Sequence, residues 1–124
     1  FGFGLSYTKF EYSDLVIEKT GETDFKVSVS VKNIGDVDGD EVVQLYIHDL
    51  VSTVMTPLKL LQGFERISLK AGETKTVEFS LNFDSFRLLN KDYEWVVEDG
   101  DFEIMVGASS DDIRLKEIIN ITRN

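Results

Sequence analysis

The chain has 124 residues, of which 42% are hydrophobic, and its 13 basic and 23 acidic side chains give a formal net charge of −10. This excess of acid argues against nucleic acid and membrane surfaces as partners, because clustered Lys and Arg bind both. The absence of cysteine excludes a disulfide framework, a thiolate nucleophile and a cysteine metal site. No apolar run approaches the roughly 18 residues of a membrane span. The length suits one hydrophobic core, so the sequence predicts a single acidic domain.

Apolar residues recur at every second position along most of the chain, which is the spacing of strands with one buried face. The first segment, residues 10–17, has a break near Ser13 and Asp14 that predicts a β-bulge. The last, residues 113–121, is predicted to shift register once, between Leu115 and Ile119. The remaining strands are predicted at residues 25–31, 43–47, 77–81, 93–97 and 102–106.

Glycine-containing turn clusters separate these segments at strand-length intervals. They lie at residues 20–22, 34–36, 38–40, 71–73 and 98–100. Two stretches remain: residues 50–63, predicted as a long crossover loop around Pro57, and residues 83–90, the single helical candidate. The pattern predicts an all-β fold, an antiparallel β-sandwich of immunoglobulin-like type with about seven strands.

Few side chains suggest catalysis. His48 is the single histidine and lies in the polar register of its strand, without a second histidine to share a metal. No nucleophile-elbow sequence offers a serine for it to activate, so a surface role is favoured. The acidic residues at 98–101 and 111–112 are favoured as solvated turn residues over the facing pair that glycosidic cleavage needs.

Asp36, Asp38 and Asp40 alternate as at the start of an EF-hand calcium loop. That loop needs glycine at its sixth position and a carboxylate at its twelfth, where this chain has Glu41 and Ile47. The EF-hand interpretation therefore fails, and a weak calcium site of another kind remains as an alternative.

Tyr93 and Trp95 support two interpretations. Exposed aromatic rings could stack on sugars, as they do in carbohydrate-binding modules. The alternation of Tyr93, Trp95 and Val97 favours a place in the core instead. Residues 120–122 match the glycosylation acceptor pattern, and we interpret that match as chance.

The opening residues, FGFGLSYTKF, closely resemble the F-G-x-G-L-S-Y-T-x-F signature of a known family. This signature opens the C-terminal fibronectin type III-like domain of family 3 glycoside hydrolases, which are mostly β-glucosidases and β-xylosidases. Further blocks resemble that family in the same order, at residues 31–46, 57–64, 69–73 and 95–110. The resemblance covers roughly residues 1 to 110, and it explains residues 36–41 as a family turn.

The resemblance implies a fibronectin type III-like sandwich that works as a non-catalytic accessory module. In this family the nucleophilic Asp lies on an upstream barrel and the acid/base Glu usually on an upstream α/β domain. No catalytic, cofactor-binding or metal-binding residue is therefore expected here, and no cofactor. The chain by itself is expected to be no enzyme, but a fragment of a hydrolase acting on O-glycosyl bonds.

The expected partners are the barrel and α/β domains of the same polypeptide. Residues 1–8 are predicted to be an interdomain linker, and residues 9–124 the sandwich. Contacts with a neighbouring domain are expected from Phe1, Phe3, Leu5 and Tyr7, and the same apolar segment is a candidate surface for a homo-oligomer. A carbohydrate-binding module and a free-standing adhesion domain remain as alternative functions, and cytoplasmic, periplasmic and secreted locations all remain open.

Overall fold

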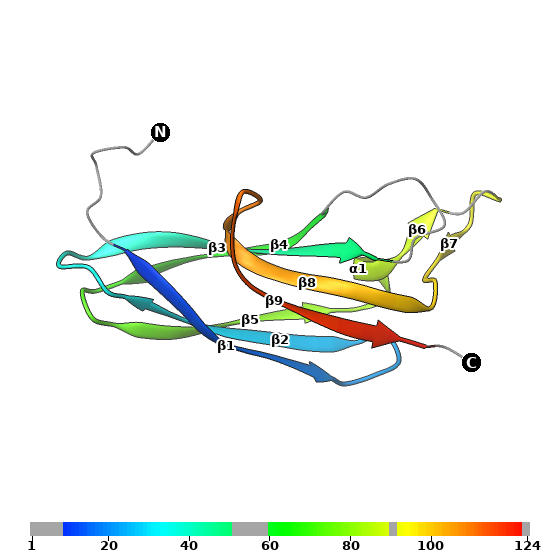
Figure 1. Ribbon diagram of the computed structural model, residues 1–124, viewed down its shortest axis with the longest axis horizontal. Helices are drawn as coiled ribbons and strands as arrows, with labels where there is room; N and C mark the ends of the chain where they lie inside the picture. The colour runs from blue at the N-terminus through cyan, green and yellow to red at the C-terminus, as the bar shows by residue number, and fades with distance from the viewer. Residues whose placement is uncertain (1–8, 51–59, 90–91, 123–124) are drawn as a thin grey trace.

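A computed structural model describes residues 9–50, 60–89 and 92–122 of the chain. Two antiparallel sheets face each other, one with strand order β1-β2-β5 and one with order β4-β3-β8-β9 (Figure 1). The first contains β1 (Phe10–Lys19), β2 (Phe25–Asn33) and β5 (Thr74–Leu81). The second contains β4 (Leu60–Leu69), β3 (Gly39–Asp49), β8 (Gly100–Ser109) and β9 (Asp112–Ile121). These seven strands confirm the predicted all-β sandwich.

The period-two apolar positions form the core between the two sheets. Their side chains are fully or almost fully buried because successive residues of a strand point to opposite faces. The core is lined from the first sheet by Val27, Val29, Val31, Val77 and Leu81, and from the second by Val43, Leu45, Phe102, Ile104, Val106 and Ile121. The predicted strands at 25–31, 43–47, 77–81 and 102–106 are thereby confirmed.

Both irregular strands are present, one as predicted and one not. β1 pairs with β2 through a register shift between Ser13 and Val16, with Asp14 at φ 54°, so the predicted bulge is confirmed. The register of β9 against β8 runs without a shift from Leu115 to Ile121. The predicted slip between Leu115 and Ile119 is therefore wrong. Glu117 keeps the alternation at an exposed edge-strand position, and the shifts lie near Gly107.

The helical candidate at 83–90 is mostly not helical. The helix α1 covers Phe83–Phe86, with Asn82 as its N-cap. Within the described residues, no helix is long and apolar enough to cross a membrane. Phe86 is buried edge-on between Phe25 and Phe102, with ring centroids 5.5 and 5.0 Å away. The chain then forms a two-stranded hairpin of β6 (Leu88–Leu89) and β7 (Trp95–Val96) at one end of the sandwich (Figure 1).

The predicted crossover loop at 50–63 is wrong at its C-terminal end. Residues 51–59 lie outside the described residues, but β4 begins at Leu60 and pairs with β3 from Ile47 backwards. Leu45 pairs with Gly63 and Tyr46 with Leu61, so Gln62 is an extra residue that breaks the period of two. This bulge places both Leu61 and Phe64 on the outer face of the sheet, which hid the strand from a pattern search.

Candidate functional site

The residues predicted to contact a neighbouring domain, Phe1, Phe3, Leu5 and Tyr7, lie outside the described residues, so the site must be sought elsewhere. The described ranges offer six features: the acidic turn, the surroundings of His48, the two lateral sides of the sandwich, the outer face of the larger sheet, and the β6–β7 hairpin.

The acidic turn at residues 36–41 is part of the scaffold. Asp38 accepts a hydrogen bond from the Ala71 backbone amide at 3.0 Å, and Asp40 accepts one from Arg66 at 2.8 Å. The Arg66 guanidinium holds the pKa of the Asp40 carboxyl below its usual range. In residues 9–50, 60–89 and 92–122, no three His, Asp or Glu side chains form a group that could hold a metal ion.

Asn33 fixes the same turn, and sequence reasoning assigned it no role. Its buried amide donates to the carbonyls of Val37 at 2.9 Å and Leu69 at 3.1 Å, and its side-chain oxygen accepts from the Gly35 amide at 2.9 Å. A buried amide of this kind must have partners, because an unpaired one costs about 1–3 kcal/mol. An Asn between a strand and a glycine turn was the available signal.

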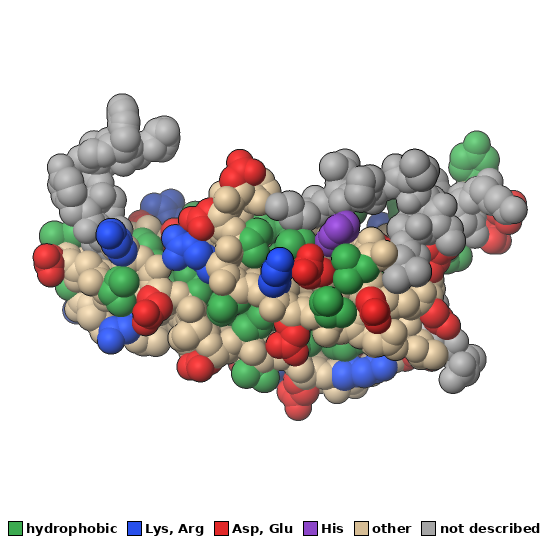
Figure 2. Space-filling model, in the orientation of Figure 1, with side chains coloured by type: hydrophobic (Ala, Val, Ile, Leu, Met, Phe, Trp, Pro, Cys, Tyr) green, Lys and Arg blue, Asp and Glu red, His purple; other side chains and the backbone are tan. Residues whose placement is uncertain are grey.

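His48 lies on the outer face of β3, half-buried next to Glu103 (Figure 2, in purple). Its Nδ1 is 3.9 Å from the Glu103 carboxylate, which also lies 3.9 Å from the Lys116 ammonium. These separations are too long for the hydrogen bond between a base and the group that it activates. The geometry accords with the surface role favoured from sequence.

Strands β1 and β9 meet along one lateral side of the sandwich, which we call the closed side. Arg114 of β9 binds Asp112 through two nitrogens, at 2.6 and 3.0 Å, and donates to the Phe10 carbonyl of β1 at 2.9 Å. Its guanidinium also lies over the Tyr12 ring, 5.3 Å from the centroid. The hydrogen bonds between the two side chains raise the pKa of Arg114 and lower the pKa of Asp112. This cluster joins the two sheets.

Tyr12 extends the closed side to β3. Its hydroxyl donates to Glu41 at 2.8 Å. Burial, and then the bond to the carboxylate, raise the pKa of Tyr12 far above its usual range, so it stays a neutral donor.

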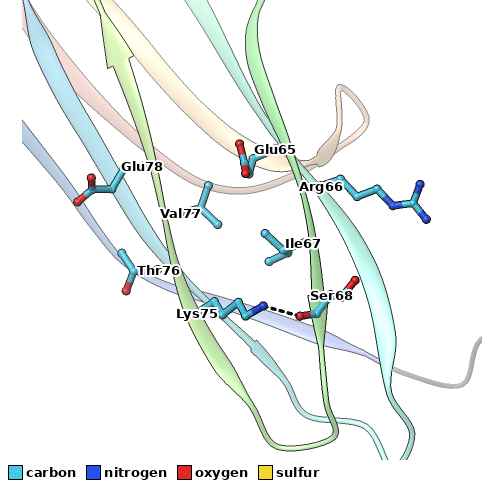
Figure 3. Close-up of a pocket in the computed structure, with 8 residues that line it drawn as sticks. All are labelled: Glu65, Arg66, Ile67, Ser68, Lys75, Thr76, Val77 and Glu78. Atoms are coloured by element: carbon cyan, nitrogen blue, oxygen red, sulfur yellow. Dashed lines mark hydrogen bonds between the residues drawn. The ribbon is translucent and has the colours of Figure 1, made fainter.

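Strands β4 and β5 form the opposite lateral side, which we call the open side (Figure 3). A groove of about 480 Å³ runs between them. Ile67 and Val77 point into it from the two strands together with Glu65 and Lys75, while the other lining side chains, Arg66, Ser68, Thr76 and Glu78, point away from the gap (Figure 3). The Lys75 ammonium crosses it and donates a hydrogen bond to the Ser68 carbonyl at 2.9 Å. Most of the residues that line the groove are polar or charged.

The outer face of the larger sheet carries exposed apolar side chains that we call the outer-face patch: Val42, Leu61 and Phe64. The register puts them on one face, since Phe64 pairs with Gln44 and Leu61 with Tyr46. Phe64 is 67% exposed. Large apolar side chains that gather on one face often mark a contact with another protein surface.

Trp95 and Tyr93 contradict the interpretation that sequence favoured. Trp95 is 54% exposed and Tyr93 84% exposed, so neither belongs to the core. Tyr93 has φ 61°, which interrupts the extended chain, and only Val97 of the alternating set is buried. Arg87 lies over the Trp95 ring, 4.2 Å from its centroid.

The described residues therefore form a β-sandwich with a polar closed side, an open groove and two exposed apolar features, which is the structure of a binding or packing module. Residues 41–110 match the model of the fibronectin type III-like domain. The chain belongs to this fibronectin type III-like family, and its resemblance to the C-terminal module of family 3 glycoside hydrolases is confirmed.

Relatives place the module in longer proteins. The chain is 49% identical over 125 residues to thermostable β-glucosidase B of Acetivibrio thermocellus, covering 98% of this chain and 17% of that protein. It is 53% identical over 121 residues to a β-xylosidase of Formosa agariphila, covering 92% of this chain and 16% of that protein. The chain thus spans less than a fifth of the length of these relatives.

Solved structures agree. A family 3 β-glucosidase of Bifidobacterium adolescentis superposes with a TM-score of 0.89 at 36% identity, over 98% of this chain and 18% of that one. A β-glucosidase of Kluyveromyces marxianus gives a TM-score of 0.88 at 42% identity, over 99% of this chain and 15% of that one. The fibronectin type III-like module is thus a small part of much larger chains.

Proposed function

We propose that this chain is the non-catalytic accessory module of a family 3 glycoside hydrolase of β-glucosidase or β-xylosidase type, and that it packs against upstream barrel and α/β domains and stabilises them. One observation carries the proposal: nearly the whole chain matches a segment that forms less than a fifth of such enzymes. The family model of the fibronectin type III-like domain, matched by residues 41–110, supports it.

If the chain is such an accessory module, its parts take different roles. Residues 1–8 form the linker to the preceding domain, with Phe1, Phe3, Leu5 and Tyr7 as its contacts, and residues 9–124 form the sandwich. The outer-face patch is a second contact surface. A domain that covers Phe64 and Leu61 removes their apolar surface from water, which is favourable. The same apolar surfaces could pair two copies of the isolated chain.

The packing role is tested by comparing the isolated module with the longer natural chain that contains it. The double variant Leu61→Ser/Phe64→Ser removes apolar surface from the patch. Val16→Ser, at a 55% exposed position of β1, is the matched control. We expect the double variant to lower the melting temperature of the longer chain by several degrees more than the control does, with both within about two degrees in the isolated module. Equal effects in the longer chain would contradict packing through this face.

Absence of catalysis is tested with nitrophenyl β-glucoside and β-xyloside. The isolated module should show no turnover, while the longer chain hydrolyses at least one of the two. Turnover by the isolated module that persists through purification would contradict the proposal.

Sedimentation of the isolated module tests whether two copies pair through the outer-face patch. Pairing predicts an apparent mass that rises with concentration, and the Leu61→Ser/Phe64→Ser variant should abolish that rise.

A second candidate function is carbohydrate binding. The exposure of Trp95 and Tyr93 favours it, since a sugar-binding platform requires aromatic rings outside the core.

A further inference from the structure

The β6–β7 hairpin presents a half-exposed indole with a guanidinium over its ring. β6 and β7 pair Leu89 with Trp95, so Arg87 is the diagonal neighbour of Trp95 on the same face of the hairpin. The guanidinium lies 4.2 Å from the centroid of the ring. Arg87 is held in turn by Asp84, at 3.3 Å. More than half of the Trp95 surface stays exposed although one ring face is covered.

Core residues anchor both strands of the hairpin. Phe86, immediately before Arg87, is packed between the rings of Phe25 and Phe102. Val97, two residues after Trp95, is buried in the same core. Arg87 and Trp95 are therefore attached, within one and two residues, to buried side chains of the core. A surface fixed in this way loses little conformational entropy when a ligand binds.

We propose that Trp95, with Arg87 over one face of its ring and the exposed Tyr93 two residues before it, forms a stacking platform for a neutral β-linked gluco- or xylo-oligosaccharide. The stacking site rests on the geometry of the hairpin, and the class of sugar rests on the proposed function. Pyranose rings with equatorial substituents have flat faces of C–H groups that fit an indole, and the sugar would stack on the face of the Trp95 ring opposite the Arg87 guanidinium.

Charge and composition narrow the ligand further. Arg87 is paired with Asp84, so the platform has no unbalanced positive charge, and the chain carries a net charge of −10. An anionic polymer would therefore be repelled, whereas a neutral sugar is not. The outer-face patch differs, because it combines one aromatic ring with aliphatic side chains and has the composition of a protein contact.

Trp95 is the only tryptophan of the chain, so its fluorescence reports on the platform alone. We would titrate the module with cellohexaose and xylohexaose, and with α-linked maltohexaose as a control, and measure affinities in parallel by calorimetry. We expect a saturable change in Trp95 emission with at least one β-linked sugar and none with maltohexaose. A flat titration with both β-linked sugars would overturn the platform, and equal binding of maltohexaose would overturn its ligand class.

Variants locate the site. Trp95→Ala should weaken calorimetric binding at least about tenfold, which is the scale of a central aromatic contact, and Tyr93→Ala should weaken it about threefold. Phe64→Ala, which truncates an exposed aromatic on another face, should leave the affinity unchanged. Unchanged binding by Trp95→Ala, or equal losses in Phe64→Ala, would overturn the assignment. All three positions are exposed, so the melting temperatures should stay close to that of the parent.

The longer natural chain separates this proposal from the packing role. Acrylamide should quench Trp95 in the isolated module, and in the longer chain a single-tryptophan version should be quenched as strongly. Protection of Trp95 in the longer chain would show that another domain covers it. That result would overturn the sugar platform and leave the accessory role standing.

Discussion

The two lateral sides of the sandwich are held together by different means. On the closed side, Arg114 bridges β9 to the Phe10 carbonyl and the Tyr12 ring, and Tyr12 reaches Glu41 of β3. On the open side, a groove separates β4 from β5, and the Lys75 ammonium crosses it to a backbone carbonyl. Among the described residues, the closed side is a network in which each group fixes the next, whereas the Lys75 contact across the open side joins an exposed ammonium to a carbonyl.

The difference shows which part of the module is scaffold. Coupled groups that include a half-buried carboxylate are costly to break, because each loss leaves a partner unsatisfied. An exposed lysine contact is replaced by water at little cost. Substitutions on the closed side should therefore affect stability more strongly than comparable ones on the open side.

The largest effect is expected at Gly107, where β8 and β9 pair. A Cβ there would lie 2.1 Å from the Asp112 carbonyl oxygen, so the backbone that positions Arg114 must move. Gly107→Ala should cost about 3 kcal/mol or more in free energy of unfolding, measured by urea denaturation. Gly72→Ala is the control in the β4–β5 turn, where φ is 82° and no atom lies within 4 Å of the added Cβ. It should cost about 1–2 kcal/mol from the left-handed backbone alone. Equal costs would contradict the contrast between the sides.

Tyr12→Phe tests the link to β3. Losing the hydroxyl leaves the half-buried Glu41 carboxylate without this donor, and we expect a loss of about 1–2 kcal/mol near neutral pH. The pKa of Tyr12 is raised on folding, so its contribution is fully present below the unfolded pKa of 10.0 and is lost as the pH rises above it.

Denaturant unfolding of the parent and of Tyr12→Phe between pH 7 and 11 measures this pH dependence. Above about pH 10, the parent should lose roughly 1.4 kcal/mol per pH unit more than the variant does, because one proton is retained only in the folded state. A difference between the two proteins that stays constant with pH would contradict a buried neutral Tyr12.

Arg114→Lys should cost about 1 kcal/mol, because lysine cannot keep both bonds to Asp112 and also reach the Phe10 carbonyl. Arg66→Lys is the matched change on the open side, where the pair with Asp40 is exposed, and it should cost no more than about 0.5 kcal/mol. Urea midpoints of the two variants give the comparison directly. A larger loss for Arg66→Lys would reverse it.

The sequence pattern predicted the strands that have one buried face and one face in water. It missed strands whose two faces are similar in exposure. Residues 25–31 alternate cleanly because one face is core and the other water. β4 escaped detection because the bulge at Gln62 and the exposed Phe64 remove that contrast. Trp95 was misplaced for a related reason: alternation with Val97 suggests a buried residue, and only the left-handed Tyr93 shows that the chain has left the sheet. The closed side was unpredictable, since its partners are separated by as many as 104 positions.

The smallest effect is expected at Lys75 on the open side. Lys75→Ala should change the free energy of unfolding by no more than about 0.5 kcal/mol, because the ammonium is exposed and water replaces it at the Ser68 carbonyl. Lys26→Ala is the control for the lost positive charge, since Lys26 forms a loose exposed pair with Glu78 at 4.0 Å. Urea midpoints of the two variants should agree. A loss above 1 kcal/mol specific to Lys75→Ala would mean that this side chain closes the groove as Arg114 closes the other side, and the contrast between the two sides would fail.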